Sequence, residues 1–182
     1  MTLDPSVLEL RPAVLRREFQ DGNVTRYPES HYLDFVVDGR ALGDVANAGP
    51  DVVTLLNRAW LPTVADSIKE LLGERPVEGL TQGRIALLVC GVCGDLACAA
   101  VTASLRFDAE SVTWSDFAWE NGYEAADPIS ETPESLTFNR HQYQAAFEDA
   151  FDRVAELPYD ELAHVGRKFL WPWQWGWRLP RD

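Results

Sequence analysis

The chain has 182 residues, of which 46% are hydrophobic and 25% are charged, a composition typical of a globular protein with a hydrophobic core. Its formal net charge of −13 argues against nucleic-acid binding, because phosphates need a basic surface. The longest apolar run, IALLVCGVC, is far shorter than the roughly 20 residues that span a bilayer, so we expect no membrane segment.

The first forty residues predict β-strands. In residues 14–27, VLRREFQDGNVTRY, the pair Asp21-Gly22 lies between two partly apolar runs, which indicates a hairpin. In HYLDFVVDG the residues Leu33, Phe35 and Val37 recur with a period of two, so they should share the core face of a strand.

A helical section follows. Residues 51–60, DVVTLLNRAW, predict a short helix that Pro62 breaks or restarts. In residues 62–73, PTVADSIKELLG, the apolar side chains have the spacing i, i+4, i+7, i+8 of a helix face, and Gly73 suits its C-terminal cap. A second helix is marked by Asn139 as its N-cap and should extend to about Glu156. Its buried stripe would be Tyr143, Phe147, Phe151 and Val154.

Between these helices, three runs predict an antiparallel meander over about 84–92, 97–107 and 112–119. A long acidic loop comes next. The order of elements predicts the α+β class, with the meander (about 84–119) and the N-terminal strands packed against two or three helices. We expect one domain over 1–182, with an aromatic C-terminal tail at about 169–182.

All three cysteines fall in the stretch RIALLVCGVCGDLACAA, residues 84–100. A hairpin centred on Gly94 would place Cys90 opposite Cys98, with Cβ atoms roughly 4.5–5.5 Å apart, and Cys93 in the turn between them. The same register would put Cys90 and Cys98 on the smaller, non-core face of the sheet. The first residues show no basic stretch followed by an apolar run, so we expect no signal peptide and a cytoplasmic protein in which these thiols are reduced.

The cysteines allow three interpretations. CGVCGD resembles a zinc knuckle, in which two thiolates point at one metal, but a tetrahedral structural site needs four ligands. The fourth could be His31, His141, His164, Asp95, a water or a partner's side chain, and His141 is the preferred choice. Redox chemistry would need a lowered thiol pKa, usually from a helix that begins after the first cysteine. Alternatively, the thiols are buried, inert and act as small hydrophobes.

A second candidate site combines aromatic and acidic residues. Residues 107–139 contain eight carboxylates and no lysine or arginine, and the tail WPWQWGW places four tryptophans at a period of two. These features predict a surface that captures a basic protein partner, although the aromatic side chains could instead fill the core. The candidate partner-binding residues are Trp114, Asp116, Trp119, Glu120, Tyr123, Trp171, Trp173, Trp175 and Trp177. The tail could also fold over the acidic region of its own chain.

The strings CGVCGDLACAAVTASL, VTWSDFAWEN and FNRHQYQAAF resemble a group of uncharacterised proteins from high-GC Gram-positive bacteria. The resemblance covers about 84–147. Some sequences of that group carry the label "oxidoreductase", but the resemblance implies no activity and transfers no functional residue.

The sequence contains no phosphate loop, dinucleotide fingerprint or HExxH motif, which favours binding over catalysis. We therefore expect an acidic binding protein, for example an inhibitor or immunity-type protein for a basic partner, in which the cysteine hairpin could hold zinc. The alternative is a small thiol- or metal-dependent oxidoreductase. The sequence does not indicate an oligomeric state.

Overall fold

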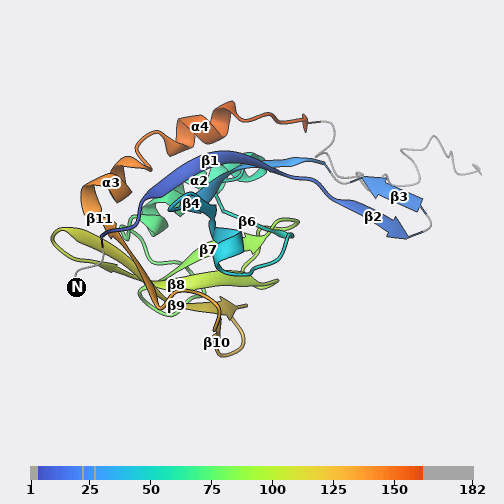
Figure 1. Cartoon of the computed structure of the whole chain (residues 1–182). Coiled ribbons are helices and arrows are strands. Elements are labelled where there is room, and N and C mark those ends of the chain that lie inside the picture. The colour runs from blue at the N-terminus through green and yellow to red at the C-terminus, as the bar shows by residue number, and fades with distance from the viewer. Residues whose placement is uncertain (1–3, 22, 27, 162–182) are drawn as a thin grey trace, which may run out of the picture.

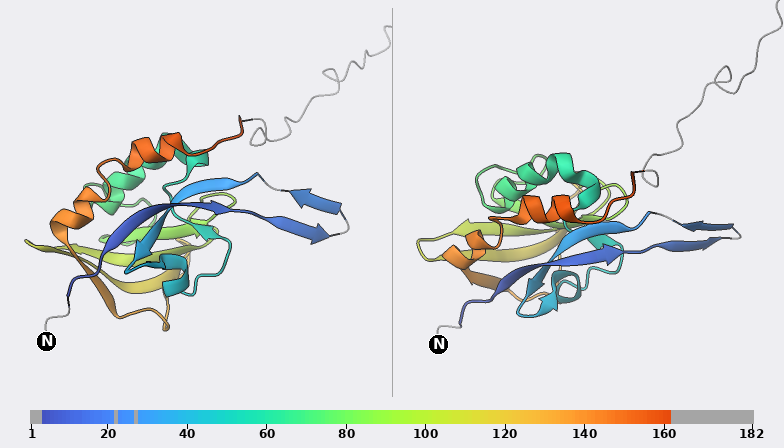
Figure 2. Two further views of the ribbon diagram at one scale, coloured as in Figure 1. Left: turned by 45° about the horizontal axis from the view of Figure 1, so that its top comes forward. Right: turned by 90° about the horizontal axis from the view of Figure 1, so that it is seen from above.

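The computed structural model describes residues 4–21, 23–26 and 28–161. It confirms the α+β class. Helices α2 (Leu61–Leu71), α3 (Arg140–Ala145) and α4 (Ala150–Glu156) lie along one side of the molecule and the larger antiparallel sheet along the other (Figures 1 and 2). The larger sheet has the strand order β10-β9-β8-β7-β6, and β11 also pairs with β9. Its strands are β6 (Val52–Val53), β7 (Arg84–Cys90), β8 (Ala100–Phe107), β9 (Ser111–Glu120), β10 (Asp127–Pro128) and β11 (Ser135–Asn139).

A smaller sheet contains β1 (Leu8–Leu15), β4 (Ser30–Val37) and β5 (Arg40–Ala41). The helices are α1 (Leu42–Val45), the 3-10 helix η1 (Arg58–Trp60), α2 (Leu61–Leu71), α3 (Arg140–Ala145) and α4 (Ala150–Glu156). Among the described residues, no helix has both the length and the apolar character needed to cross a membrane.

The strand predictions for the N-terminal region are confirmed. Leu33, Phe35 and Val37 of β4 are all buried in the main core. The strands β2 (Glu18–Asp21) and β3 (Asn23–Arg26) pair as an antiparallel hairpin, although Gly22 itself lies outside the described residues. This hairpin extends away from the rest of the molecule (Figure 1).

The helix predicted over residues 51–60 is wrong. This segment forms β6 and η1 instead, because it runs extended beside β4. Leu33 donates its N–H to the Leu56 carbonyl at 2.9 Å, and the Thr54 hydroxyl donates to the Leu33 carbonyl at 2.6 Å. The tertiary hydrogen bonds therefore override the local helical pattern. The following helix, α2, is confirmed, with Val64 and Leu71 buried.

The meander is confirmed, but its register changes in the middle of β7. Arg84 and Ala86 lie opposite Ser104 and Thr102 as expected. The pairing then shifts at a bulge, so that Leu88 lies opposite Val101. A bulge inserts one extra residue and reverses the faces that follow it. After it, Leu88 joins the main core, and Val89 joins a smaller cluster on the other face.

The helix predicted from Asn139 to Glu156 is two helices. Asn139 is the N-cap as predicted, since its side chain accepts from the Gln142 N–H at 3.1 Å. After α3 the chain makes tighter turns, and the Ala150 N–H bonds to the Phe147 carbonyl at 3.2 Å. This overwinding moves the buried stripe onto Ala150 and leaves Phe151 41% exposed, contrary to its predicted place in the stripe.

Trp114 of β9 lies at the centre of the core and is 0% exposed. Its ring contacts Phe35, Phe138 and Tyr143 edge-on. Its indole N–H donates to the Tyr143 hydroxyl at 3.2 Å, and that hydroxyl donates to the Leu71 carbonyl at 2.8 Å. One buried polar chain thus joins β9, α3 and the end of α2.

Candidate metal centre

The three cysteine sulfurs lie together in the connection between β7 and β8. The Sγ atoms of Cys90, Cys93 and Cys98 are all within 4.8 Å of one another. Cys90 ends β7, Cys93 lies in the turn that follows, and Cys98 lies just before β8. The prediction that the three sulfurs are neighbours is therefore confirmed.

The geometry that gathers them differs from the predicted one. Because of the bulge, Cys90 does not lie opposite Cys98, and Cys98 lies in a turn and not in a strand. Strand alternation also places Cys90 on the face of Leu88 and not on the smaller face. The sulfurs meet through two consecutive turns.

The first turn encloses the Cys90 sulfur. The Gly94 N–H donates to the Cys90 carbonyl at 2.9 Å, which closes the turn, and Gly94 has φ +67°. The backbone N–H groups of Val92 and Cys93 hydrogen-bond to the Cys90 sulfur. Burial opposes ionisation of this thiol, but these N–H groups and the neighbouring thiols outweigh it and lower the pKa of Cys90.

The second turn brings in Cys98. The Cys98 N–H donates to the Asp95 carbonyl at 3.2 Å, and the Asp95 carboxylate accepts from the Ala97 N–H at 2.9 Å. Hydrogen bonding to Cys90 and repulsion between the two sulfurs raise the pKa of Cys98 to about 11, with Cys93 adding to both effects. The triad therefore holds one thiolate easily and resists a second one unless a cation is present.

Two glycines allow the first turn to pack closely against other parts of the molecule. A Cβ atom on Gly94 would come within 2.8 Å of the Trp60 indole, and one on Gly91 would come within 2.6 Å of the Leu15 side chain. The Arg17 guanidinium also packs against Gly91, at 2.8 Å from the same Cβ position. These contacts come from segments remote in sequence, and the pattern CxxCG gave no signal for them.

The observed exposure contradicts the buried, space-filling role that the inert interpretation gave to the three thiols. Cys90 is half-buried, but Cys93 and Cys98 are exposed. They therefore do not fill space in the core. A thioredoxin-like arrangement is also lacking, because residues 91–99 form turns and no helix begins after Cys90 in this stretch.

The structure does not bring His141 to the triad. Its neighbour Arg140 donates its N–H to the Glu110 carbonyl at 3.0 Å, so α3 begins beside the β8–β9 turn. The cysteines lie at the other end of β8, a strand of eight residues and therefore about 23 Å long. His31 lies within 3.4 Å of Glu29 instead, and His164 is outside the described residues. In the described part of the chain, the three thiols are the only group of metal-ligand side chains this close together.

The predicted partner-binding residues fall in different environments. Trp114 is fully buried and belongs to the core, and Trp119 is half-buried and packs against it. Tyr123 is 83% exposed, and Asp116 is exposed as well. The four tryptophans of the tail, Trp171, Trp173, Trp175 and Trp177, lie outside the described residues. The capture of a basic partner stays a prediction.

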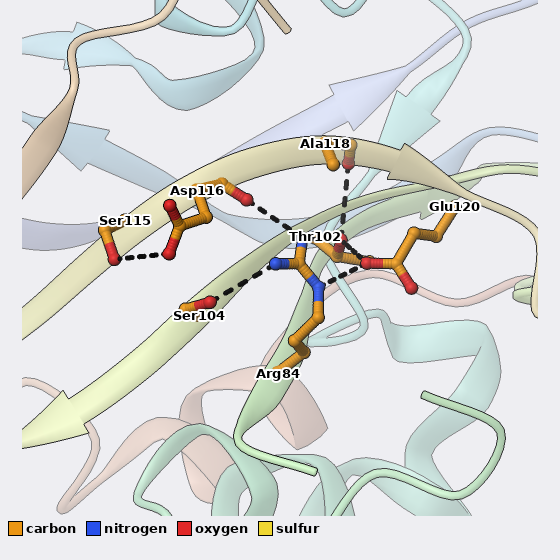
Figure 3. Close-up of polar contacts among 7 residues, drawn as sticks. All are labelled: Arg84, Thr102, Ser104, Ser115, Asp116, Ala118 and Glu120. Atoms are coloured by element: carbon orange, nitrogen blue, oxygen red, sulfur yellow. Dashed lines mark hydrogen bonds and ion pairs between the residues drawn. The ribbon is translucent and has the colours of Figure 1, made fainter. Parts of the chain in front are cut away.

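Glu120 belongs to a polar network on the smaller face of the sheet (Figure 3). It forms an ion pair with Arg84, and both side chains are largely buried, at 8% and 12% exposure. Arg84 also donates to the Thr102 hydroxyl at 2.6 Å and to the Asp116 carbonyl at 3.0 Å. Figure 3 shows Asp116 and Glu120 on either side of the guanidinium, which separates the two carboxylates.

A pocket of about 200 Å³ borders the triad. It lies between Cys98 and the loop that follows β9, because Ala100 pairs with Glu120 in the neighbouring strand. Its lining residues are Cys98, Ala99, Trp119, Glu120, Asn121, Glu124, Ala125 and Asp127. The sequence showed the carboxylates but not that they lie beside a cysteine.

No protein-family model, curated protein or solved structure matches this chain. The resemblance to a bacterial protein group therefore stays a prediction.

Proposed function

We propose that this protein binds zinc through the thiolates of Cys90, Cys93 and Cys98. The observation that carries the proposal is the mutual approach of the three sulfurs, all within 4.8 Å. A tetrahedral zinc ion with Zn–S bonds of about 2.3 Å needs sulfurs about 3.8 Å apart. The triad is close to that spacing, and small movements of two exposed turns would complete it.

The hydrogen bonds of the turn support a thiolate ligand at Cys90. Two backbone N–H groups point at its sulfur, and donors of this kind stabilise negative charge. Cys98 has the opposite tendency, because the first thiolate opposes its ionisation. A divalent cation between the sulfurs removes this repulsion, so binding the metal and deprotonating the second thiol are coupled.

Zinc fits the donor set better than the hard cations do. Thiolates are soft ligands that select zinc, copper(I) or iron–sulfur clusters, whereas magnesium and calcium prefer oxygen. Three protein ligands leave one coordination position for a further ligand, which is the pattern of zinc sites that bind a water or a substrate. The role of the metal would be to order the β7–β8 connection and to present that position.

The proposal is tested by purifying the full chain without chelator under reducing conditions and measuring its metal content. We expect one zinc ion per chain. The variants C90S, C93S and C98S should each lose most of it, whereas V92S should keep it. Val92 is a matched control, because it lies in the same turn, is 61% exposed and offers no sulfur. Zinc content that is negligible, or equal in all four variants, would refute the proposal.

The oxidoreductase alternative uses the same residues. Its support is the exposed Cys93 and Cys98 thiols beside a Cys90 thiol with a lowered pKa. One thiolate would attack a peroxide, taking one oxygen as a sulfenic acid and releasing water or an alcohol, and a second thiol would then displace water from the sulfenic acid to form the disulfide. Rapid formation of an intrachain disulfide with peroxide, in protein that contains no metal and does not take up zinc, would favour this alternative.

A further inference from the structure

We propose that the open coordination position of the metal accepts a small, positively charged nitrogen donor, such as an imidazole or amine on a cationic molecule. This inference rests on the proposed zinc site. It adds the chemical class of the ligand, which the triad alone does not specify.

The first observation is the ligand count. Three sulfurs converge, and the described part of the chain brings no fourth ligand to them. A zinc ion held by three protein ligands takes its fourth from solution. Cys93 and Cys98 are exposed, so such a ligand can reach the metal.

The second observation is the position of the acidic pocket. Cys98 is both a member of the triad and part of the pocket wall, so the pocket borders the proposed metal site. The volume of about 200 Å³ suits a small molecule and not a folded segment of protein. The pocket therefore continues the metal site on the side of Cys98.

The lining of the pocket selects the charge of the ligand. Glu124 and Asp127 supply carboxylates, and the indole of Trp119 offers an aromatic surface that favours cations. Asn121 fixes Glu124 by donating to its carboxylate at 3.0 Å. Glu120 contributes a third carboxylate, of which one oxygen is held by Arg84 and Thr102. An anionic ligand would be repelled here, whereas a cation would be attracted.

A nitrogen donor follows from the same electrostatics. A carboxylate or thiolate ligand would bring negative charge to a metal that already carries three thiolates. A neutral nitrogen atom on a positively charged molecule can coordinate the metal while its cationic group contacts Glu124 or Asp127. The two interactions reinforce each other only when one molecule carries both groups.

The test uses the full chain loaded with cobalt(II), whose visible bands report the coordination of the metal. Three probes with the same imidazole donor differ in charge: histamine is cationic, imidazole is neutral and imidazole-4-acetate is anionic. We expect histamine to bind about fivefold more tightly than imidazole, as one ion pair allows, and imidazole-4-acetate to bind most weakly. Added salt should reduce the difference.

Two double variants separate the effect of the pocket carboxylates from the effect of the protein's overall charge. E124Q/D127N should abolish the preference for histamine, and E134Q/D152N, which removes the same charge outside the pocket, should retain it. Equal affinities for the three probes, or a preference that survives in E124Q/D127N, would overturn the inference. So would visible bands that change in H164A, because His164 would then be the fourth ligand. If cobalt shows no thiolate charge-transfer bands at all, the proposed metal site itself fails.

Discussion

The indole of Trp60 lies against Gly94, the glycine that closes the first cysteine turn. A Cβ atom at Gly94 would come within 2.8 Å of the ring, and φ at this residue is +67°. The turn that carries Cys90 and Cys93 thus requires glycine for two reasons, its backbone conformation and its contact with Trp60. The position of the cysteine turn therefore depends on Trp60, a residue thirty-four positions earlier in the chain.

This contact predicts the effect of G94A. An alanine must adopt a left-handed conformation and also displace the indole, so the sulfurs should move apart. We expect the zinc affinity to fall at least about tenfold, since the left-handed conformation alone costs roughly 1–2 kcal/mol. G79A is the matched control, because Gly79 has φ +88° but no atom within 4 Å of its Cβ position. Competition with a chromophoric chelator measures both affinities, and equal affinities in the two variants would contradict the role of Trp60.

The pKa of Cys98 predicts how zinc binding depends on pH. Its thiol, with a pKa of about 11, is protonated in the metal-free protein at neutral pH and must lose this proton to bind zinc. Raising the pH therefore strengthens binding, by about tenfold per pH unit for each proton released. Calorimetric titrations in buffers of different ionisation enthalpy count the protons. A zinc affinity that is constant between about pH 6 and pH 8 would contradict this coupling.

The ion pair between Arg84 and Glu120 predicts a large effect on stability. R84M leaves the Glu120 carboxylate largely buried without its cation, which should cost about 3 kcal/mol of unfolding free energy. R84M/E120L should recover part of that loss, because both charges are then removed. R106M is the control, since Arg106 is 73% exposed in its pair with Asp108 and should change stability by less than about 1 kcal/mol. Urea unfolding measures all three variants, and a loss in R84M no larger than in R106M would refute the argument.

The Tyr143 hydroxyl predicts a second, separate effect on the core. Y143F removes the acceptor of the Trp114 indole N–H and the donor to the Leu71 carbonyl, and it leaves both groups buried. We expect a loss of about 1–3 kcal/mol. Y123F changes a tyrosine that is 83% exposed and should be neutral. Thermal unfolding compares the two, and equal melting temperatures would show that the buried chain of hydrogen bonds contributes nothing.

The sequence was most informative where local chemistry decides the structure. The alternation of Leu33, Phe35 and Val37 predicted their common face, and Asn139 was predicted as a helix cap and is one. The bulge in β7 could not be predicted in the same way. Ala86, Leu87, Leu88 and Val89 are all apolar, so the sequence does not show where the alternation between the two faces of the strand shifts. Only packing decides which face each side chain takes.

The candidate site was predicted in part. The cluster of three sulfurs was predicted from hairpin geometry, but two turns create it, and the expected ligand His141 lies near the other end of β8. The N–H donors to Cys90 depend on the conformation of the turn, which the spacing CxxCG suggests. The contacts from Trp60 and Arg17, and the pocket beside Cys98, arise from tertiary folding and have no local pattern.

The most direct test of the metal site is a zinc titration of the reduced full chain with a simultaneous count of reactive thiols. We predict that one equivalent of zinc binds and protects Cys90, Cys93 and Cys98 from a thiol reagent, and that a chelator restores their reactivity. If the three thiols react at the same rate with and without zinc, and no stoichiometric binding is seen, the cysteine triad is not a metal site.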